Sequence, residues 1–208
     1  MNIACIYTVE TYDSLEMPIS AATEIPFGIA TIYTALEQAG HNVELFVITP
    51  DTPLDEYLKD YILCKHPKMF CFTAVSTQYW QAKKVAKYVK SVNSNIFCLL
   101  GGHEASMNSQ NVIQQGIFDA ICVSEGEKAV VEIADSIENG FINKDIYNLW
   151  FYNRVNGEIK KNLNSPFTQN LDDLPLFNRK VWDKWVKRPD DYPAILLGRG
   201  CPFKCTYC

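Results

Sequence analysis

The chain has 208 residues, 48% of them hydrophobic, so it can bury a substantial core as one domain plus a short additional segment. Its formal net charge of −5 argues against a nucleic-acid-binding surface. No apolar run approaches the roughly 18 residues of a membrane span, and residues 1–7 lack the basic region and cleavage site of a signal peptide. We therefore expect a cytoplasmic protein that binds neither nucleic acid nor a membrane.

The first 140 residues alternate short apolar runs with amphipathic stretches. Near-continuous apolar runs, typical of parallel strands covered on both faces, predict strands at 3–7, 43–48, 69–75, 96–100 and 120–123. Helical spacing between them predicts helices at 27–39, 54–63, 81–90, 106–115 and 127–138. This alternation predicts an α/β fold with a doubly wound, five-stranded parallel sheet in the flavodoxin-like order 2-1-3-4-5.

The pattern changes after Gly140. The dipeptide Asn156-Gly157, flanked by the segments 149–155 and 158–161, predicts a β-hairpin. A segment rich in Pro and Asn follows at 165–191, in which Trp182 and Trp185 are candidates to pack the linker against a neighbouring domain. Residues 192–197 then predict one more strand. We expect three regions: a first domain at 1–140, a hairpin and linker at 141–191, and the start of a second domain at 192–208.

Three of the eight cysteines stand close together, in the arrangement C-x3-C-x2-C formed by Cys201, Cys205 and Cys208. Thiolates at this spacing converge on one metal centre. Three of them would bind three irons of a [4Fe–4S] cluster and leave the fourth iron open, whereas a structural zinc site uses four protein ligands. The other five cysteines are scattered, four of them in apolar runs, and predict buried thiols in a reducing compartment. They are Cys5, Cys64, Cys71, Cys98 and Cys122.

Ligands of an open parallel sheet bind beyond the carboxyl ends of its strands, and four stretches of the predicted domain follow such ends. The connection 8–25, which leads into Pro26-Phe27-Gly28, is long enough to be functional or simply mobile. After the third strand, Thr73, Ser76 and Thr77 offer hydrogen bonds to a ligand, or ordinary helix capping.

The remaining two stretches follow the fourth and fifth strands. The pair Gly101 and Gly102 lets a flat group approach the backbone, although many turns use such a pair, and His103 is either a ligand contact or a surface residue. The acidic residues of Glu125-Gly126-Glu127 suit either a ligand or the dipole of the following helix.

The terminal sequence Gly-Arg-Gly-Cys-Pro-Phe-Lys-Cys-Thr-Tyr-Cys resembles the signature of the radical S-adenosylmethionine (radical SAM) enzymes. The resemblance implies that the three cysteines bind a [4Fe–4S] cluster, that SAM chelates the open iron, and that Tyr207 lies against the adenine of SAM. It also implies an electron donor such as flavodoxin or ferredoxin. The catalytic barrel of the family is expected after Cys208, so we expect an incomplete enzyme that is inactive alone.

The stretches at the strand ends resemble, in their order and spacing, the cobalamin-binding domain of one branch of these enzymes. The resemblance implies cobalamin contacts from Thr73, Ser76, Thr77, Gly101, Gly102, His103, Glu125 and Gly126. The sequence departs from related domains in three respects. It has no Asp-x-His-x-x-Gly motif to give cobalt a lower histidine ligand, Ser124 stands where the branch often has glycine, and no Pro-Glu follows Ser106.

We therefore expect a cobalamin-dependent radical SAM enzyme acting on a small molecule. The implied reaction is methyl transfer to an unactivated carbon or phosphorus, with oxidative cyclisation as the close alternative. Two rivals remain open: a non-catalytic cofactor-binding module, and a tRNA methylthiotransferase. The second would need three cysteines of the first domain for another cluster, whereas Cys5, Cys71, Cys98 and Cys122 lie inside predicted strands. The substrate and the oligomeric state are not determined by these residues.

Overall fold

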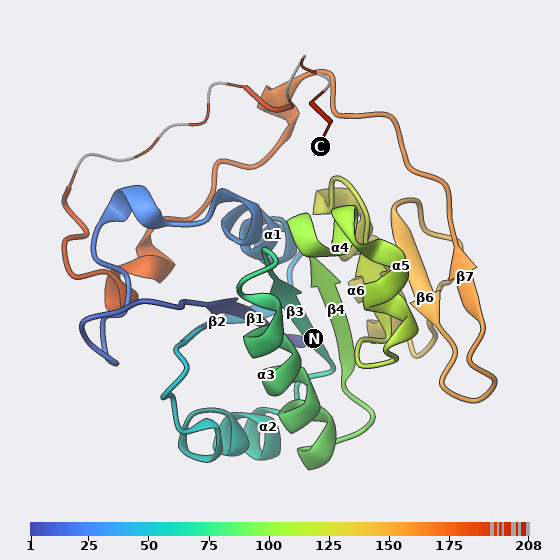
Figure 1. The fold of residues 1–208 in the computed structure, drawn as a ribbon, viewed down its shortest axis with the longest axis horizontal. Helices are drawn as coiled ribbons and strands as arrows, with labels where there is room; N and C mark the ends of the chain where they lie inside the picture. Colours follow the sequence, from blue (N-terminus) through green and yellow to red (C-terminus); the bar gives the residue numbers. More distant parts are fainter. Residues whose placement is uncertain (192–193, 195, 197, 201–202, 204, 207–208) are drawn as a thin grey trace.

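The structure is a computed structural model that describes residues 1–191, 194, 196, 198–200, 203 and 205–206. A seven-stranded sheet with the order β2-β1-β3-β4-β5-β6-β7 forms its central layer (Figure 1). The strands are β1 Asn2–Thr8, β2 Asn42–Ile48, β3 Met69–Thr73, β4 Phe97–Gly101, β5 Ala120–Cys122, β6 Leu149–Tyr152 and β7 Ile159–Lys161. The first five are parallel and follow the predicted order.

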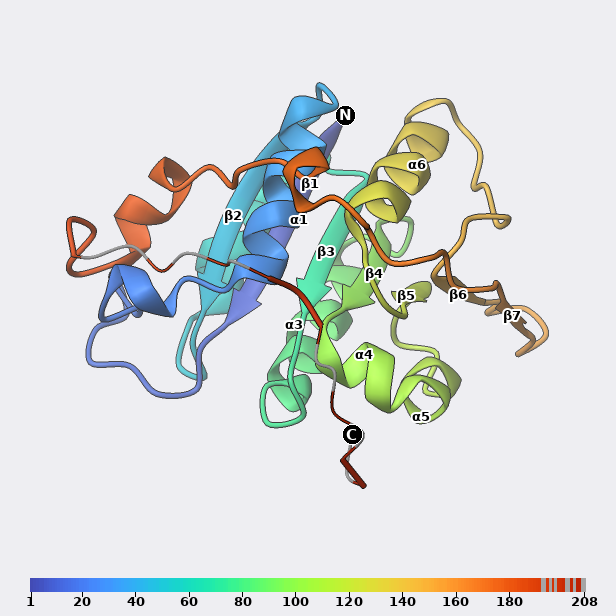
Figure 2. The same ribbon diagram turned by 90° about the horizontal axis from the view of Figure 1, so that it is seen from above.

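Helices cover both faces of the parallel part, as the view from above shows (Figure 2). The helices α1 Phe27–Gln38 and α6 Glu127–Glu138 pack on one face. The other face carries α2 Asp60–Lys65, α3 Tyr79–Val92, α4 His103–Met107 and α5 Ser109–Gln114. None of the helices in the described part of the chain has the length and apolar character needed to cross a bilayer.

Two of the predicted helices differ from the structure. The stretch predicted at 54–63 begins with a wider π-helical segment, Asp55–Lys59, before α2. The stretch predicted at 106–115 is two short helices, α4 and α5, that meet at Asn108. At this junction Met107 is exposed and the next two residues, Asn108 and Ser109, are polar, so no apolar stripe continues from one helix into the other.

The predicted five-strand count was wrong, because the hairpin joins the same sheet. Strand β6 pairs antiparallel with β5, matching Ala120 with Phe151 and Cys122 with Leu149, and β7 pairs antiparallel with β6. Without the hairpin, the short apolar strand β5 would be an open edge, and pairing satisfies its backbone groups. The predicted last strand at 192–197 lies outside the described residues except at 194 and 196.

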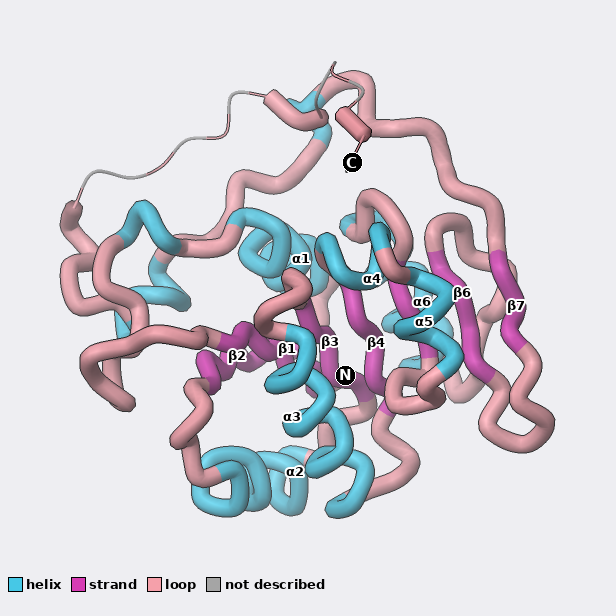
Figure 3. Tube along the Cα trace, in the orientation of Figure 1, coloured by secondary structure: helices cyan, strands magenta, loops and turns pink. Residues whose placement is uncertain are grey.

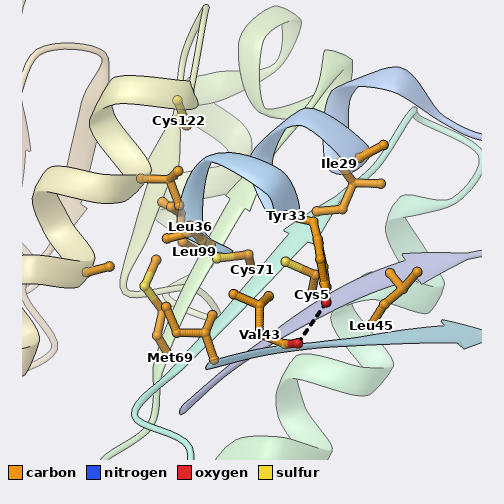
Figure 4. Close-up of a cluster of buried hydrophobic side chains, with 14 of the residues drawn as sticks. Cys5, Ile29, Tyr33, Leu36, Val43, Leu45, Met69, Cys71, Leu99 and Cys122 are labelled. Atoms are coloured by element: carbon orange, nitrogen blue, oxygen red, sulfur yellow. Dashed lines mark hydrogen bonds between the residues drawn. The ribbon is translucent and has the colours of Figure 1, made fainter. Parts of the chain in front are cut away.

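Two apolar clusters, one on each face, form the core. Figure 4 shows part of the cluster between the sheet and α1, where the Tyr33 hydroxyl donates a hydrogen bond of 3.0 Å to the carbonyl oxygen of Val43. Four of the scattered cysteines are buried as predicted, namely Cys5, Cys71, Cys98 and Cys122, while Cys64 is exposed. Burial raises the pKa of the Cys98 thiol to about 12.

The linker packs against the first domain itself. Trp182 is fully buried and lies edge-on to Tyr7, with 6.0 Å between ring centroids. Beside it, the backbone of Ile19 donates to the carbonyl of Trp185 at 3.1 Å and accepts from Lys187 at 2.9 Å. The tryptophans thus complete the core of the first domain, and they hold both the linker and the loop before α1 in place.

Replacing Trp182 with alanine should therefore lower the free energy of unfolding by about 3–5 kcal/mol, the usual cost of removing a large buried aromatic side chain. Urea denaturation followed by circular dichroism measures the change. Leu176→Ala is the matched control, because Leu176 lies in the same linker but is 95% exposed. A loss below about 1 kcal/mol for Trp182→Ala would show that the linker is not part of the folding unit.

Candidate cofactor site at the carboxyl ends of the strands

A cavity of about 950 Å³ lies at the carboxyl ends of β3, β4 and β5. In the tube view these ends lie at the upper edge of the sheet, beneath the linker and the last described residues (Figure 3). The wall comes from the strand ends, the first turn of α1, the loop before α6, the linker at 167–169 and 171, and the tail at 196 and 198–200. The sheet edge alone therefore does not build the site.

The structure brings most of the predicted cofactor residues together. The cavity is lined by Thr73, Gly101, Gly102, His103, Glu125 and Gly126. Ser76 and Thr77 are not among the lining residues. The Ser76 hydroxyl donates to the Glu104 carboxylate at 2.6 Å, and the Thr77 hydroxyl donates to the Glu10 carboxylate at 2.8 Å. These two side chains support neighbouring loops instead.

The long connection 8–25 contributes no residue to the cavity wall, although the adjoining Phe27 and Gly28 do. The side chains of Ile19, Ala21, Ala22 and Ile25 are buried, so much of this connection belongs to the core. Its length comes from covering one end of the sheet, where Ile19 pairs with Val186.

Three glycines of the wall have different reasons to be glycine. A Cβ on Gly102 would lie 2.7 Å from the Thr73 hydroxyl and 2.9 Å from the Ala74 carbonyl oxygen, and its φ of +87° disfavours other residues. A Cβ on Gly101 would make only ordinary contacts, at 3.8 and 3.9 Å. A Cβ on Gly28 would meet no atom within 4 Å. Gly28 therefore leaves open space in the cavity, whereas Gly102 permits the close approach of two loops.

Ser124 is one of the non-glycine residues with positive φ, at +98°. Its backbone N–H donates to the Ser106 hydroxyl at 3.2 Å, which holds the loop after β5 against α4. A side chain at this φ carries strain that glycine would not. This strained backbone lies in the cavity wall.

Glu125 and Glu127 connect this wall to two distant segments. The Glu125 carboxylate accepts hydrogen bonds of 2.8 Å from both the backbone and the hydroxyl of Thr168. The Glu127 carboxylate accepts 2.6 Å from Arg199 and 3.2 Å from the Thr31 hydroxyl. Neither Thr168 nor Arg199 was predicted as a site residue, since no local pattern marks a contact between residues 43 or 72 positions apart.

Two cysteines also line the cavity, and sequence reasoning assigned them only to the core. Burial raises the pKa of the Cys122 thiol to about 12. A hydrogen bond with Cys5, followed by burial, raises the pKa of Cys71 well above its usual value. Both groups are therefore neutral thiols near pH 7, which makes this part of the wall apolar.

The terminal motif is only partly described. Cys205 is exposed, and Cys201, Cys208 and Tyr207 lie outside the described residues. His103 is the histidine among the described lining residues. His41 lies elsewhere, at the amino end of β2, where it is buried and its Nε2 is 3.2 Å from the Asp135 carboxylate.

A doubly wound parallel sheet with a glycine-lined cavity at its strand ends defines a cofactor-binding α/β domain. The model of the B12 binding domain family matches residues 20–134, more than half of the chain. The chain belongs to this family.

Curated relatives are similar to this chain over most of its length. An uncharacterized methyltransferase of Pyrococcus horikoshii is 26% identical over 91% of this chain and 41% of its own length. The anaerobic magnesium-protoporphyrin IX monomethyl ester cyclase of Rubrivivax gelatinosus is 25% identical over 88% and 34%. The hopanoid C-3 methylase of Methylococcus capsulatus is 25% identical over 88% and 35%. The chain thus spans less than half the length of these relatives.

Solved structures share the fold. The radical SAM methyltransferase TsrM of Kitasatospora setae superposes with a TM-score of 0.60 at 17% identity, covering 74% of this chain and 29% of TsrM. The cobalamin-dependent radical SAM enzyme OxsB gives 0.60 at 15% identity, covering 80% and 22%. The family match confirms the expected cobalamin-binding domain. The two solved structures, both of radical SAM enzymes, share its fold.

The cavity residues fit the cofactor of the family. The open space at Gly28, the ordinary contacts available at Gly101 and the neutral thiols leave room for a large, largely apolar ring. Thr73 and His103 add polar groups to the wall. The chain has no Asp-x-His-x-x-Gly motif, so these residues fit a cobalamin that takes no histidine ligand from such a motif.

Glu127 should make the stability of the domain depend on pH. Burial alone would raise its pKa, but hydrogen bonds from Arg199 and the backbone, the charge of Arg199 and the Thr31 hydroxyl together bring the pKa below 4.5. Because this pKa is lower in the folded state, the carboxylate stabilises the fold fully above about pH 4.5, and this contribution disappears as the pH falls through the folded pKa.

Urea denaturation between about pH 6 and about pH 3 should therefore show a steeper acid loss of stability for the wild type than for Glu127→Gln. Glu132→Gln, on the exposed side of α6, should keep the wild-type slope. Equal slopes for the wild type and Glu127→Gln would contradict the assigned ion pair.

Proposed function

We propose that this chain is the cobalamin-binding part of a radical SAM enzyme, with cobalamin held in the cavity at the ends of β3, β4 and β5. One observation carries the proposal: the cavity of a B12-binding domain is crossed by the segment that leads into the three-cysteine motif. Cys201, Cys205 and Cys208 would hold a [4Fe–4S] cluster, with SAM on its open iron and Tyr207 against the adenine.

Each residue of the proposed cobalamin site would have its own role. Gly28 and Gly101 make room for the ring, and Gly102 lets the loop after β4 lie against Thr73. Thr73 and His103 face the cavity as hydrogen-bonding groups, and Cys71 and Cys122 keep part of its wall apolar. Ser76, Glu125 and Gly126 would contribute to the same site, Ser76 by holding the buried Glu104 in place.

When bound, cobalamin would supply a methyl group and the cluster would supply the electron that cleaves SAM. We propose methyl transfer to an unactivated carbon or phosphorus of a small molecule as the reaction. Oxidative cyclisation is the second candidate, because the curated relatives include anaerobic cyclases at 25% and 24% identity. A flavodoxin or ferredoxin is the expected electron donor, and the cytoplasm the expected location.

Filling the cavity from Gly28 tests the cofactor assignment. Gly28→Leu adds a side chain into open space and removes a helix glycine, so it should fold at least as stably as the wild type while weakening hydroxocobalamin binding by about tenfold or more. Absorbance of the corrinoid retained through gel filtration, with titration for the dissociation constant, measures this. Gly28→Ala is the graded control and should show a smaller effect.

Gly102→Val is a less informative variant, since its side chain would collide with Thr73 and Ala74 of the protein itself. Unchanged cobalamin affinity in a folded Gly28→Leu protein would refute the assigned cavity. Absence of any binding by the wild type would refute the cofactor.

Replacing any one of Cys201, Cys205 and Cys208 with alanine in the full-length protein should abolish the iron–sulfur absorbance and the formation of 5′-deoxyadenosine under anaerobic reduction. Each thiolate would hold a separate iron, so no remaining cysteine replaces the lost ligand. Cys64→Ala is the control, because Cys64 is an exposed cysteine outside the motif. Retention of cluster and SAM cleavage in a motif variant would contradict the ligand assignment.

A further inference from the structure

Residues just before the three-cysteine motif line the cofactor cavity. Leu196, Gly198, Arg199 and Gly200 all belong to its wall, opposite the strand ends. Figure 2 shows this part of the chain passing above the ends of the parallel strands, between α1 and α4. The interactions of this segment with the domain therefore decide where it lies relative to the cavity.

Arg199 provides a charged attachment for this segment. One guanidinium nitrogen, Nη2, lies 2.6 Å from the Glu127 carboxylate, and the other, Nη1, lies 3.8 Å from that of Glu125. The Arg199 side chain is 22% exposed and the Glu127 side chain 9%. Since both ions are largely removed from water, their attraction is screened less than that of a surface pair.

Glu127 needs such a partner. It is the first residue of α6, and its carboxylate is buried beside Thr31 of α1. A buried carboxylate without a cation is costly, and removing one partner of a buried pair leaves the other charge uncompensated. Among the described residues, Arg199 is the cation paired with Glu127. Arg199 of the tail thus compensates the charge of this buried carboxylate.

The turn Glu125-Gly126-Glu127, which contains the partner of Arg199, also binds the linker. Glu125 accepts both hydrogen bonds of Thr168, and its carbonyl oxygen accepts 2.7 Å from the buried Asn148 side chain. The linker at 167–171 and the tail at 198–200 are therefore attached to adjacent points on one turn. That turn is itself fixed between β5 and α6.

We propose that Arg199 is a positioning residue, which by its ion pair with Glu127 holds the segment leading into the three-cysteine motif at the cofactor cavity. Only Gly200 separates Arg199 from Cys201 in the sequence. The inference rests on the proposed function, in which a substrate must meet groups held by both the cavity and the motif. Such reactions lose rate steeply when one group is displaced by about 1 Å.

Hydrogen exchange measured by mass spectrometry tests the attachment without any cofactor. In Arg199→Gln and in Glu127→Gln, the peptide that covers residues 194–200 should exchange about tenfold to a hundredfold faster than in the wild type, as expected for loss of a charge-assisted hydrogen bond. Arg199→Lys keeps the charge but loses the planar guanidinium group, so its exchange rate should lie between those of the wild type and Arg199→Gln. Circular dichroism first establishes that each variant is folded.

A double-mutant cycle separates the ion pair from general loosening. Because both single variants break the same interaction, the double variant should exchange no faster than either single variant. Arg188→Gln is the matched control, since Arg188 pairs with Asp191 in the linker, and it should leave the peptide unchanged. Unchanged exchange in the single variants, or fully additive effects, would overturn the inference.

In the full-length protein, Arg199→Gln should lower kcat for methyl transfer by about tenfold or more while cobalamin affinity changes by less, because the cavity remains and the motif is displaced. If the wild type binds no cobalamin, the proposed function is wrong, but the hydrogen-exchange experiment still tests the ion pair. If cobalamin binds but neither exchange nor kcat responds to the variants, only the positioning role fails.

Discussion

Parallel pairing in register is the constraint on which the site depends. The pairing of β3 with β4 sets Thr73 opposite Gly101, and β4 with β5 sets Leu100 opposite Ile121, so three strands end at one edge of the sheet. A parallel sheet must have helices on both faces, which leaves this edge as the place where loops can surround a ligand. At this edge Gly102 permits the loop after β4 to lie close to Thr73 and Ala74.

The edge becomes a cavity only because later parts of the chain return to it. The hairpin extends the sheet beside β5, and the buried Asn148 at its base bonds to both Glu125 and Ser165. The linker then runs along α1, where Phe177 lies edge-on to Phe27 with 5.4 Å between ring centroids. Trp182 ends this path in the core, so the linker has a defined course over the domain.

The Glu125-Gly126-Glu127 turn has a different character from that expected of a ligand-binding loop. Its carboxylates are satisfied by Thr168, Arg199 and Thr31 within the chain. A charge-assisted hydrogen bond is about twice as strong as a neutral one, so these contacts favour one arrangement of linker and tail. Glu125 and Glu127, which hold the linker and Arg199 through these contacts, therefore also line the cavity.

The sequence alone determined the positions of the five parallel strands, three of the five predicted helices and the burial of four cysteines, because these follow from local apolar periodicity. The order of the parallel strands followed from the fold class that this alternation implies. The sequence also indicated the family, and it marked Thr73, Gly101, Gly102, His103, Glu125 and Gly126, which follow strand ends. Tertiary structure decided what no local pattern encodes. The hairpin forms strands β6 and β7 of the same sheet, and the Ser76 hydroxyl donates to Glu104. Trp182 is buried in the core of the first domain, and Arg199 pairs with Glu127. These depend on contacts between residues distant in sequence, whose free energy arises only when the elements pack together.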